Sequence, residues 1–280
     1  MKERFRLESE LTQLEVFRPD TRDRVPISAT MDVPYRWICR LTVPDTVPTE
    51  RGYGMGTGVL VGPRHVLTAA HVLVSLDDPG KTVGSRLRVQ PARNGHDKPF
   101  DEVGVQGWQV NPRWALRRRN TWHLQPQHDF ALVTLKRDVS VWREARLGNC
   151  PLSYWGAPGR CGAGSVVGLG PNDVRGQDVH VTGYPGEKPE ATLWTGRGPI
   201  TYDSRLGMLL HTADTKPGQS GAPVWFVRNG VACLAGIHSG ASSARAIDPS
   251  GTTTLTHNDA VLLTPAVVRR IEAWKGTFRS

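Results

Sequence analysis

The chain has 280 residues, of which 38% are hydrophobic, and its formal net charge is +9 at pH 7. This length allows a substantial core in one domain or in two fused half-domains, and the even spread of aromatic and β-branched residues argues against a disordered chain. No stretch approaches the roughly 18 uninterrupted apolar residues that a membrane-spanning helix needs, so we expect no membrane partner.

The positive charge is scattered along the chain. Its densest cluster, residues 117–119, lies in a polar stretch rich in Gln, Asn and Trp, which is typical of a solvated loop. The chain contains no recognisable nucleic-acid-binding motif, so we expect no nucleic-acid partner.

Residues 1–15 are charged and carry periodic apolar side chains, which predicts a short helix or an unstructured leader. The first ten residues lack the apolar core of a signal peptide. We therefore expect either a cytoplasmic protein or one whose export segment is absent from this sequence.

From Trp37 onward, short apolar runs alternate with Gly, Pro, Asn and Asp. In the first half these runs are 37–43, 58–62, 65–69 and 130–135. His71 stands two residues after the third run, behind small residues that leave room for its ring. Asp129 stands at the start of the fourth run, where a carboxylate is costly to bury unless it is hydrogen-bonded.

A stretch rich in Gly and Pro, residues 150–175, separates the two halves of the chain and predicts a seam between them. Cys150 and Cys161 lie in this stretch and are placed to form a local disulfide. Cys39 and Cys233 lie in apolar runs, where we expect buried free thiols. No CxxC pair occurs, and the sequence predicts no metal site and no cofactor.

The second half continues with apolar runs at 179–182, 191–194, 208–211 and 231–235. Many short strands with turn residues between them predict an all-β barrel or sandwich. The strongest helix signal comes at the end, where Thr264 is a suitable N-cap and Pro265 a suitable first residue. The residues on one face of this helix are Val267, Val268, Ile271 and Trp274.

The stretch DTKPGQSGAPV, residues 214–224, places Ser220 between glycines just before an apolar run. If the stretch is only a turn, these are ordinary turn residues. If it is a catalytic loop, it needs a histidine to accept the serine proton and a carboxylate to orient that histidine. His71 and Asp129 are suitable partners, and the three residues together predict a catalytic triad.

With these residues the sequence resembles the chymotrypsin-like serine peptidases, and more closely their bacterial glutamyl endopeptidase branch. The matching segments are 67–71, 129–133, 181–186, 218–224 and 236–240, and Asp23–Arg24 with Ile27 and Thr30 is similar to the N-terminal segment of the branch. The resemblance covers about residues 16–275.

The resemblance implies an all-β fold of two six-stranded antiparallel β-barrels, with the active site between them and a C-terminal helix. We expect a leader or propeptide at 1–15, a first barrel at 16–160 with His71 and Asp129, a second barrel at 161–263 with Ser220, and the helix in 264–280. Ser220 is then the nucleophile, and the backbone N–H groups of Gly218 and Ser220 bind the oxyanion.

Two readings of the specificity pocket remain open. In the glutamyl branch a histidine and a threonine line this pocket, which His238 and Thr215 match, and such a pair suits a substrate carboxylate. Asp214, six residues before Ser220, instead matches the aspartate with which trypsin-type enzymes bind Lys or Arg. Ser239 departs from the aromatic residue common in the branch. We favour cleavage of protein or peptide substrates after Glu, in preference to Asp.

The resemblance also suggests how the N-terminus is used. Gln219 stands where animal trypsin-like enzymes have an aspartate that receives a freed amino terminus, so that switch is absent. In the glutamyl branch the freed terminus approaches the specificity pocket. Cleavage after Glu15 would release Val16 for that role.

Other classes of function are compatible with the sequence. One is a basic β-barrel binding module without catalysis, and another is an intracellular protease that switches a partner by limited cleavage. The family pattern favours a secreted protein, and we expect a monomer.

Overall fold

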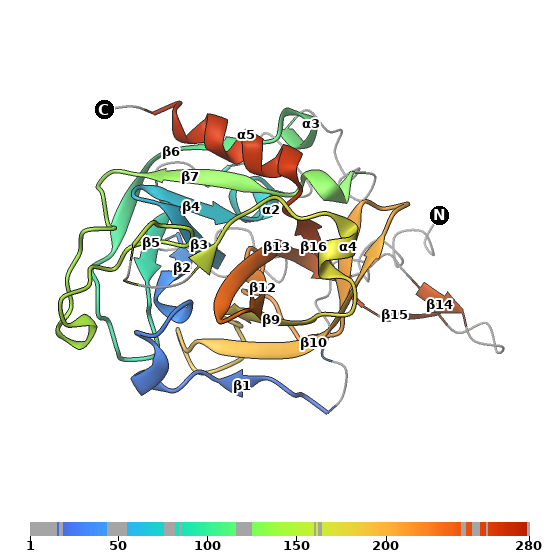
Figure 1. Cartoon of the computed structure of the whole chain (residues 1–280), viewed down its shortest axis with the longest axis horizontal. Coiled ribbons are helices and arrows are strands. Elements are labelled where there is room, and N and C mark those ends of the chain that lie inside the picture. The colour runs from blue at the N-terminus through green and yellow to red at the C-terminus, as the bar shows by residue number, and fades with distance from the viewer. Residues whose placement is uncertain are drawn as a thin grey trace.

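A computed structural model of the chain shows two β-barrels that lie side by side (Figure 1). The residues it describes are 16, 19–43, 55–75, 82–83, 86–115, 125–159, 161, 164–241, 245–247, 253–255 and 257–278. The predicted leader at 1–15 and the basic cluster at 117–119 lie outside the described residues.

Six antiparallel strands close the first barrel, in the order β2-β3-β4-β7-β6-β5. Their bounds are β2 (Ile38–Thr42), β3 (Met55–Gly62), β4 (His65–Thr68), β5 (Arg88–Pro91), β6 (Val103–Val110) and β7 (Ala131–Leu135). All five residues of β7 are buried, and the C-terminal helix α5 (Pro265–Lys275) packs against this strand (Figure 1). The rings of Phe130 and Trp274 lie 5.5 Å apart at this contact. A strand covered on both faces explains why the sequence there is apolar without alternation.

The second barrel closes because β9 pairs with both β10 and β12. Its strands are β9 (Asp178–Gly183), β10 (Trp194–Asp203), β11 (Met208–His211), β12 (Pro223–Arg228), β13 (Val231–Ala241) and β16 (Asn258–Leu262). Two short strands extend the sheet, β1 (Asp23–Arg24) beside β10 and β8 (Gly164–Ser165) beside β13. The strands β14 (Arg245–Ile247) and β15 (Thr253–Leu255) pair with each other in a separate antiparallel sheet.

The predicted fold of two six-stranded antiparallel barrels with a C-terminal helix is confirmed. Helix α5 begins as expected, since the Thr264 hydroxyl accepts a hydrogen bond from the Val267 N–H at 3.2 Å. The strand predicted at 191–194 is wrong, because β10 begins only at Trp194. The Thr192 N–H donates to the Pro189 carbonyl, so a turn occupies the start of that run.

Tryptophans pack along the seam between the barrels. The ring of Trp155 lies 5.7 Å from Trp37 and 6.2 Å from Trp225, so side chains from both halves form one cluster. The indole N–H groups are satisfied, because Trp37 donates to Leu152 and Trp155 donates to Ala232. The seam is therefore a packed core that holds the two barrels together.

The cysteines and the short helices complete the described fold. Cys150 and Cys161 form a disulfide, while Cys39 and Cys233 are buried thiols. The short helices are η1 (Ile27–Ala29), η2 (Tyr35–Trp37), α2 (Ala70–Leu73), α3 (Pro112–Ala115), η5 (Pro126–His128), η6 (Ala145–Leu147) and α4 (Pro171–Val174). Within the described part of the chain, none of the helices combines the length and the hydropathy needed to cross a bilayer.

Candidate active site

His71 and Asp129, 58 positions apart in the sequence, are in direct contact. His71 lies on α2, directly after strand β4, and Asp129 lies between η5 and β7. The His71 backbone N–H donates to Asp129 Oδ1 at 2.9 Å, and the ring Nδ1 lies 2.7 Å from Asp129 Oδ2. An ionised carboxylate only accepts hydrogen bonds, so this geometry assigns the ring proton to Nδ1. Nε2 is then left as the basic nitrogen.

Asp129 is buried, and hydrogen bonds keep it ionised. Burial alone would raise the pKa of this carboxyl group, but the nearby His71 charge and the hydrogen bonds from His71 and Ser239 outweigh burial and hold the pKa below its usual value. The Ser239 hydroxyl donates to Asp129 Oδ2. Sequence reasoning missed this role of Ser239, because nothing local marks a contact that spans 110 positions.

Ser220 lies in the loop between β11 and β12 and is flanked by two glycines with left-handed backbone angles. Gly218 has φ of +99° and Gly221 has φ of +84°, a region that other residues rarely adopt. Space is equally restrictive, since a Cβ on Gly221 would lie 2.1 Å from Thr68 Oγ1. The Ser220 carbonyl accepts a hydrogen bond from the Thr57 N–H at 2.9 Å. The loop therefore packs against β3 and β4, and β4 leads into the helix that carries His71.

The two N–H groups expected to bind the oxyanion are available. Within the described residues, the backbone N–H groups of Gly218 and Ser220 donate to no protein acceptor. Their neighbours in the loop are satisfied, because the Gln219 N–H donates to Lys216 and the Gly221 N–H donates to His238. Unpaired amides beside a serine hydroxyl are the arrangement that stabilises a tetrahedral oxyanion.

His238 lies on β13 and is fully buried. Its Nδ1 lies 3.2 Å from His211 Nε2. Burial first, and then the nearby charges of His211 and His71, hold the pKa of His238 well below its ordinary value, so the ring is neutral. Its Nε2 and the hydroxyl of Thr215 are both buried, and neither makes a hydrogen bond of normal geometry to a described residue.

Asp214 is bonded to the N-terminal segment of the described chain. It is buried, and its Oδ2 accepts hydrogen bonds from both the backbone N–H and the hydroxyl of Thr21, each at 2.7 Å. No local pattern in the sequence predicts this partner from the N-terminal segment. Val16 is half-buried, whereas Glu15, on which the processing prediction depends, lies outside the described residues.

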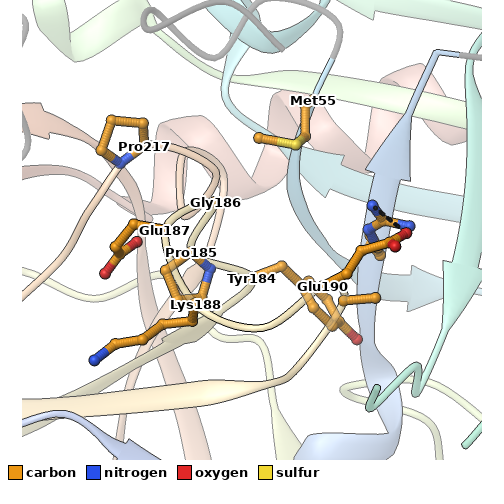
Figure 2. A pocket seen from close by; sticks show the side chains of 10 residues that line it. Met55, Tyr184, Pro185, Gly186, Glu187, Lys188, Glu190 and Pro217 are labelled. Carbon is orange, nitrogen blue, oxygen red and sulfur yellow. Dashed lines mark ion pairs between the residues drawn. The ribbon is translucent and has the colours of Figure 1, made fainter. Parts of the chain in front are cut away.

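A pocket of about 540 Å³ opens beside the Ser220 loop (Figure 2). Arg40 and Met55 of the first barrel line it, together with residues 184–188, 190–191 and Pro217 of the second half. Glu190, which is labelled in Figure 2, forms an ion pair with Arg40, and their charged atoms lie 3.6 Å apart. The Gly186 N–H donates to the Pro217 carbonyl at 2.7 Å, which joins the pocket wall to the residue before Gly218.

Comparisons with known proteins found a matching family model and several similar proteins. The family model described as trypsin-like peptidase domain matches residues 56–233, which include His71, Asp129 and Ser220. A glutamyl endopeptidase of Bacillus licheniformis is 28% identical over 203 residues, which cover 72% of this chain and 52% of that protein. An extracellular metalloprotease of Bacillus subtilis is 29% identical over 216 residues, which cover 73% of this chain and 56% of that protein. The chain thus spans about half the length of these relatives.

A solved structure of a Glu endopeptidase in complex with MPD has the same fold, with a TM-score of 0.64. It is 21% identical in sequence, and the match covers 94% of this chain and 100% of that chain. The name of the Bacillus subtilis relative refers to a metal. Among the residues described here, no group of three or more His, Cys, Asp or Glu side chains is placed to hold a metal ion.

Proposed function

Because the chain belongs to the trypsin-like peptidase domain family, we propose that it is a serine endopeptidase that cleaves protein or peptide substrates through an acyl-enzyme. The observation that carries the proposal is the double hydrogen bond from His71 to Asp129. It orients the imidazole with Nδ1 toward the carboxylate, so that Nε2 is the ring nitrogen that can act as the general base.

The reaction follows from these roles. Ser220 Oγ attacks the scissile carbonyl carbon while His71 Nε2 accepts its proton, and the N–H groups of Gly218 and Ser220 bind the developing oxyanion. His71 then gives the proton to the leaving amine, and the C–N bond breaks. A water molecule releases the acyl group by the same steps. Asp129, held by Ser239, stabilises the imidazolium throughout.

We propose cleavage after Glu, or Asp, as the finer specificity. Two buried polar groups that make no hydrogen bond of normal geometry within the described residues, His238 Nε2 and the Thr215 hydroxyl, support it, because both are able to donate to a carboxylate. If His211 Nε2 donates to His238 Nδ1, the proton of His238 sits on Nε2 and is available to a carboxylate. The alternative, cleavage after Lys or Arg, needs the carboxylate of Asp214, and Thr21 already donates twice to it.

A fluorophosphonate probe tests the catalytic proposal. Labelling of the native chain that disappears in Ser220→Ala supports a serine peptidase. Equal labelling of both proteins, or of neither, favours the basic binding module.

A mixed peptide library tests the specificity proposal in the same preparation. Cleavage after Glu or Asp is expected. Cleavage after Lys or Arg would assign the pocket to Asp214 instead, and it would leave the serine mechanism intact.

A further inference from the structure

Three residues at the N-terminal end of the described chain, 20–22, contact the loops around Ser220, and we call this segment the strap. Thr21 donates two hydrogen bonds to Asp214. The guanidinium of Arg22 donates to Gln219 and to Glu187. Both ends of the loop 214–219 are therefore bonded to the strap, and the loop that begins at Tyr184 is bonded to it as well.

Arg22 is the centre of these contacts. Its side chain is 2% exposed and pairs with the carboxylates of Asp20 and Glu187, which are 32% and 41% exposed. Lys188 adds a second cation, 3.0 Å from Asp20. The hydrogen bonds of Arg22 hold the pKa of Asp20 well below its usual range, so the cluster stays charged. A buried guanidinium is costly unless it is paired in this way, so the site is built to hold one.

Gln219 connects the strap to the catalytic loop. Its Oε1 accepts hydrogen bonds from Arg22 Nη1 at 3.2 Å and from the Lys216 N–H at 3.0 Å. Gln219 lies between Gly218 and Ser220, the residues whose N–H groups are proposed to bind the oxyanion. A shift of its side chain therefore moves the turn that aims those groups.

The strap is itself firmly placed. The residues that follow it, Asp23–Arg24, form β1 and pair with β10. Val25 is buried, its N–H donates to Leu193 and its carbonyl accepts from the Asn94 side chain. The second barrel thus presents the strap to the loops at a set position.

We propose that the strap is a clasp that holds the catalytic loop in its working conformation, with Arg22 as the positioning residue. This inference rests on the proposed peptidase function. Because Arg22 lies within the chain, the clasp is present whether or not the bond after Glu15 is cut.

The test replaces Arg22 by Met, which keeps the apolar stem and removes the guanidinium. Arg146→Met is the control for the loss of an arginine that pairs with two carboxylates, because Arg146 in η6 pairs with Asp97 at 2.8 Å and with Glu144 at 3.1 Å; its side chain is more exposed than that of Arg22. Hydrolysis of a peptide substrate with Glu at the cleavage site is measured, and fluorophosphonate titration counts the competent sites.

We expect Arg22→Met to lower kcat about tenfold or more, as the loss of charge-assisted hydrogen bonds implies. KM should change less than kcat, by under about threefold, because none of the side chains that line the pocket is replaced, and Arg22→Lys should restore part of kcat. Arg146→Met should stay within about twofold of the native kcat. Equal kcat for Arg22→Met and Arg146→Met overturns the clasp.

A milder variant guards against misfolding. Thr21→Val removes only the hydroxyl donor to Asp214, and we expect a fall in kcat of about two- to fivefold. Hydrogen exchange of the amides in residues 214–221 adds a measurement that needs no activity, and faster exchange in Arg22→Met than in Arg146→Met is expected. Unchanged exchange together with unchanged kcat in Thr21→Val overturns the clasp.

The failures of the two proposals differ. If the native chain is not labelled by the fluorophosphonate probe, the peptidase proposal is wrong. The comparison of amide hydrogen exchange between Arg22→Met and Arg146→Met still tests the clasp in that case. A native chain that is labelled normally, with variants indistinguishable from the control, sinks only the clasp.

Discussion

Replacing Asp129 by Asn tests whether the carboxylate sets the tautomer of His71. The His71 backbone N–H donates to Oδ1 at 2.9 Å, so the oxygen of the new amide must take that place. The amide NH2 then occupies the place of Oδ2, 2.7 Å from the ring Nδ1. Two donors cannot face each other there, so His71 must move its proton to Nε2, where it can no longer accept the proton of Ser220.

The size of the effect separates two explanations. If Asp129 only strengthens hydrogen bonds, its loss costs about 1.5–3 kcal/mol, or about 10- to 150-fold in rate. If it sets the tautomer, a loss of about 10⁴-fold in kcat is expected, which corresponds to about 5.4 kcal/mol in the activation barrier.

Steady-state hydrolysis near pH 8, with thermal unfolding to confirm the fold, measures the change. Asp97→Asn is the control, because its carboxylate pairs with Arg146 outside the site. A variant that keeps more than about a hundredth of the native kcat would refute the tautomer argument, because hydrogen-bond weakening alone then suffices.

The remaining predictions concern Ser239, the buried histidines and the N-terminus. Ser239→Ala removes one donor from Asp129 and should lower kcat/KM about tenfold while folding is retained; native activity would show that its hydroxyl is dispensable. Burial lowers the pKa of His211 to about 3 from 6.5, so the unfolded chain binds more protons below pH 6.5 and the free energy of unfolding should fall as pH drops from 6.5 toward 3. His211→Gln should remove up to about 1.4 kcal/mol per pH unit from that slope in urea titrations, and an unchanged slope would contradict the assignment. N-terminal sequencing of active protein should find Val16 first, and full activity with Met1 still in place would rule out processing after Glu15.

Local patterns in the sequence predicted an all-β barrel or sandwich, the C-terminal helix and the candidate catalytic residues, and the family resemblance implied the two six-stranded barrels. Each of these residues stands in a recognisable setting: His71 after an apolar strand, Asp129 before one, and Ser220 between glycines. In the structure Gly218 and Gly221 have left-handed backbone angles, and a side chain at either position would clash. Strand periodicity and turn residues determine the backbone conformation of a few neighbouring positions, so these features can be recognised in the sequence before the tertiary structure is known.

The tertiary structure alone decided which distant groups meet. Ser239 reaches Asp129 across 110 positions, and Thr21 reaches Asp214 across 193. The short-range pattern carries no information about such pairs, because strand order and barrel closure bring them together. For the same reason, the sequence left open that Asp214 binds a basic substrate, because its position in the sequence does not reveal that Thr21 lies beside it. Whether a buried carboxylate faces a ligand or a neighbouring segment depends on which donors the folded chain places beside it.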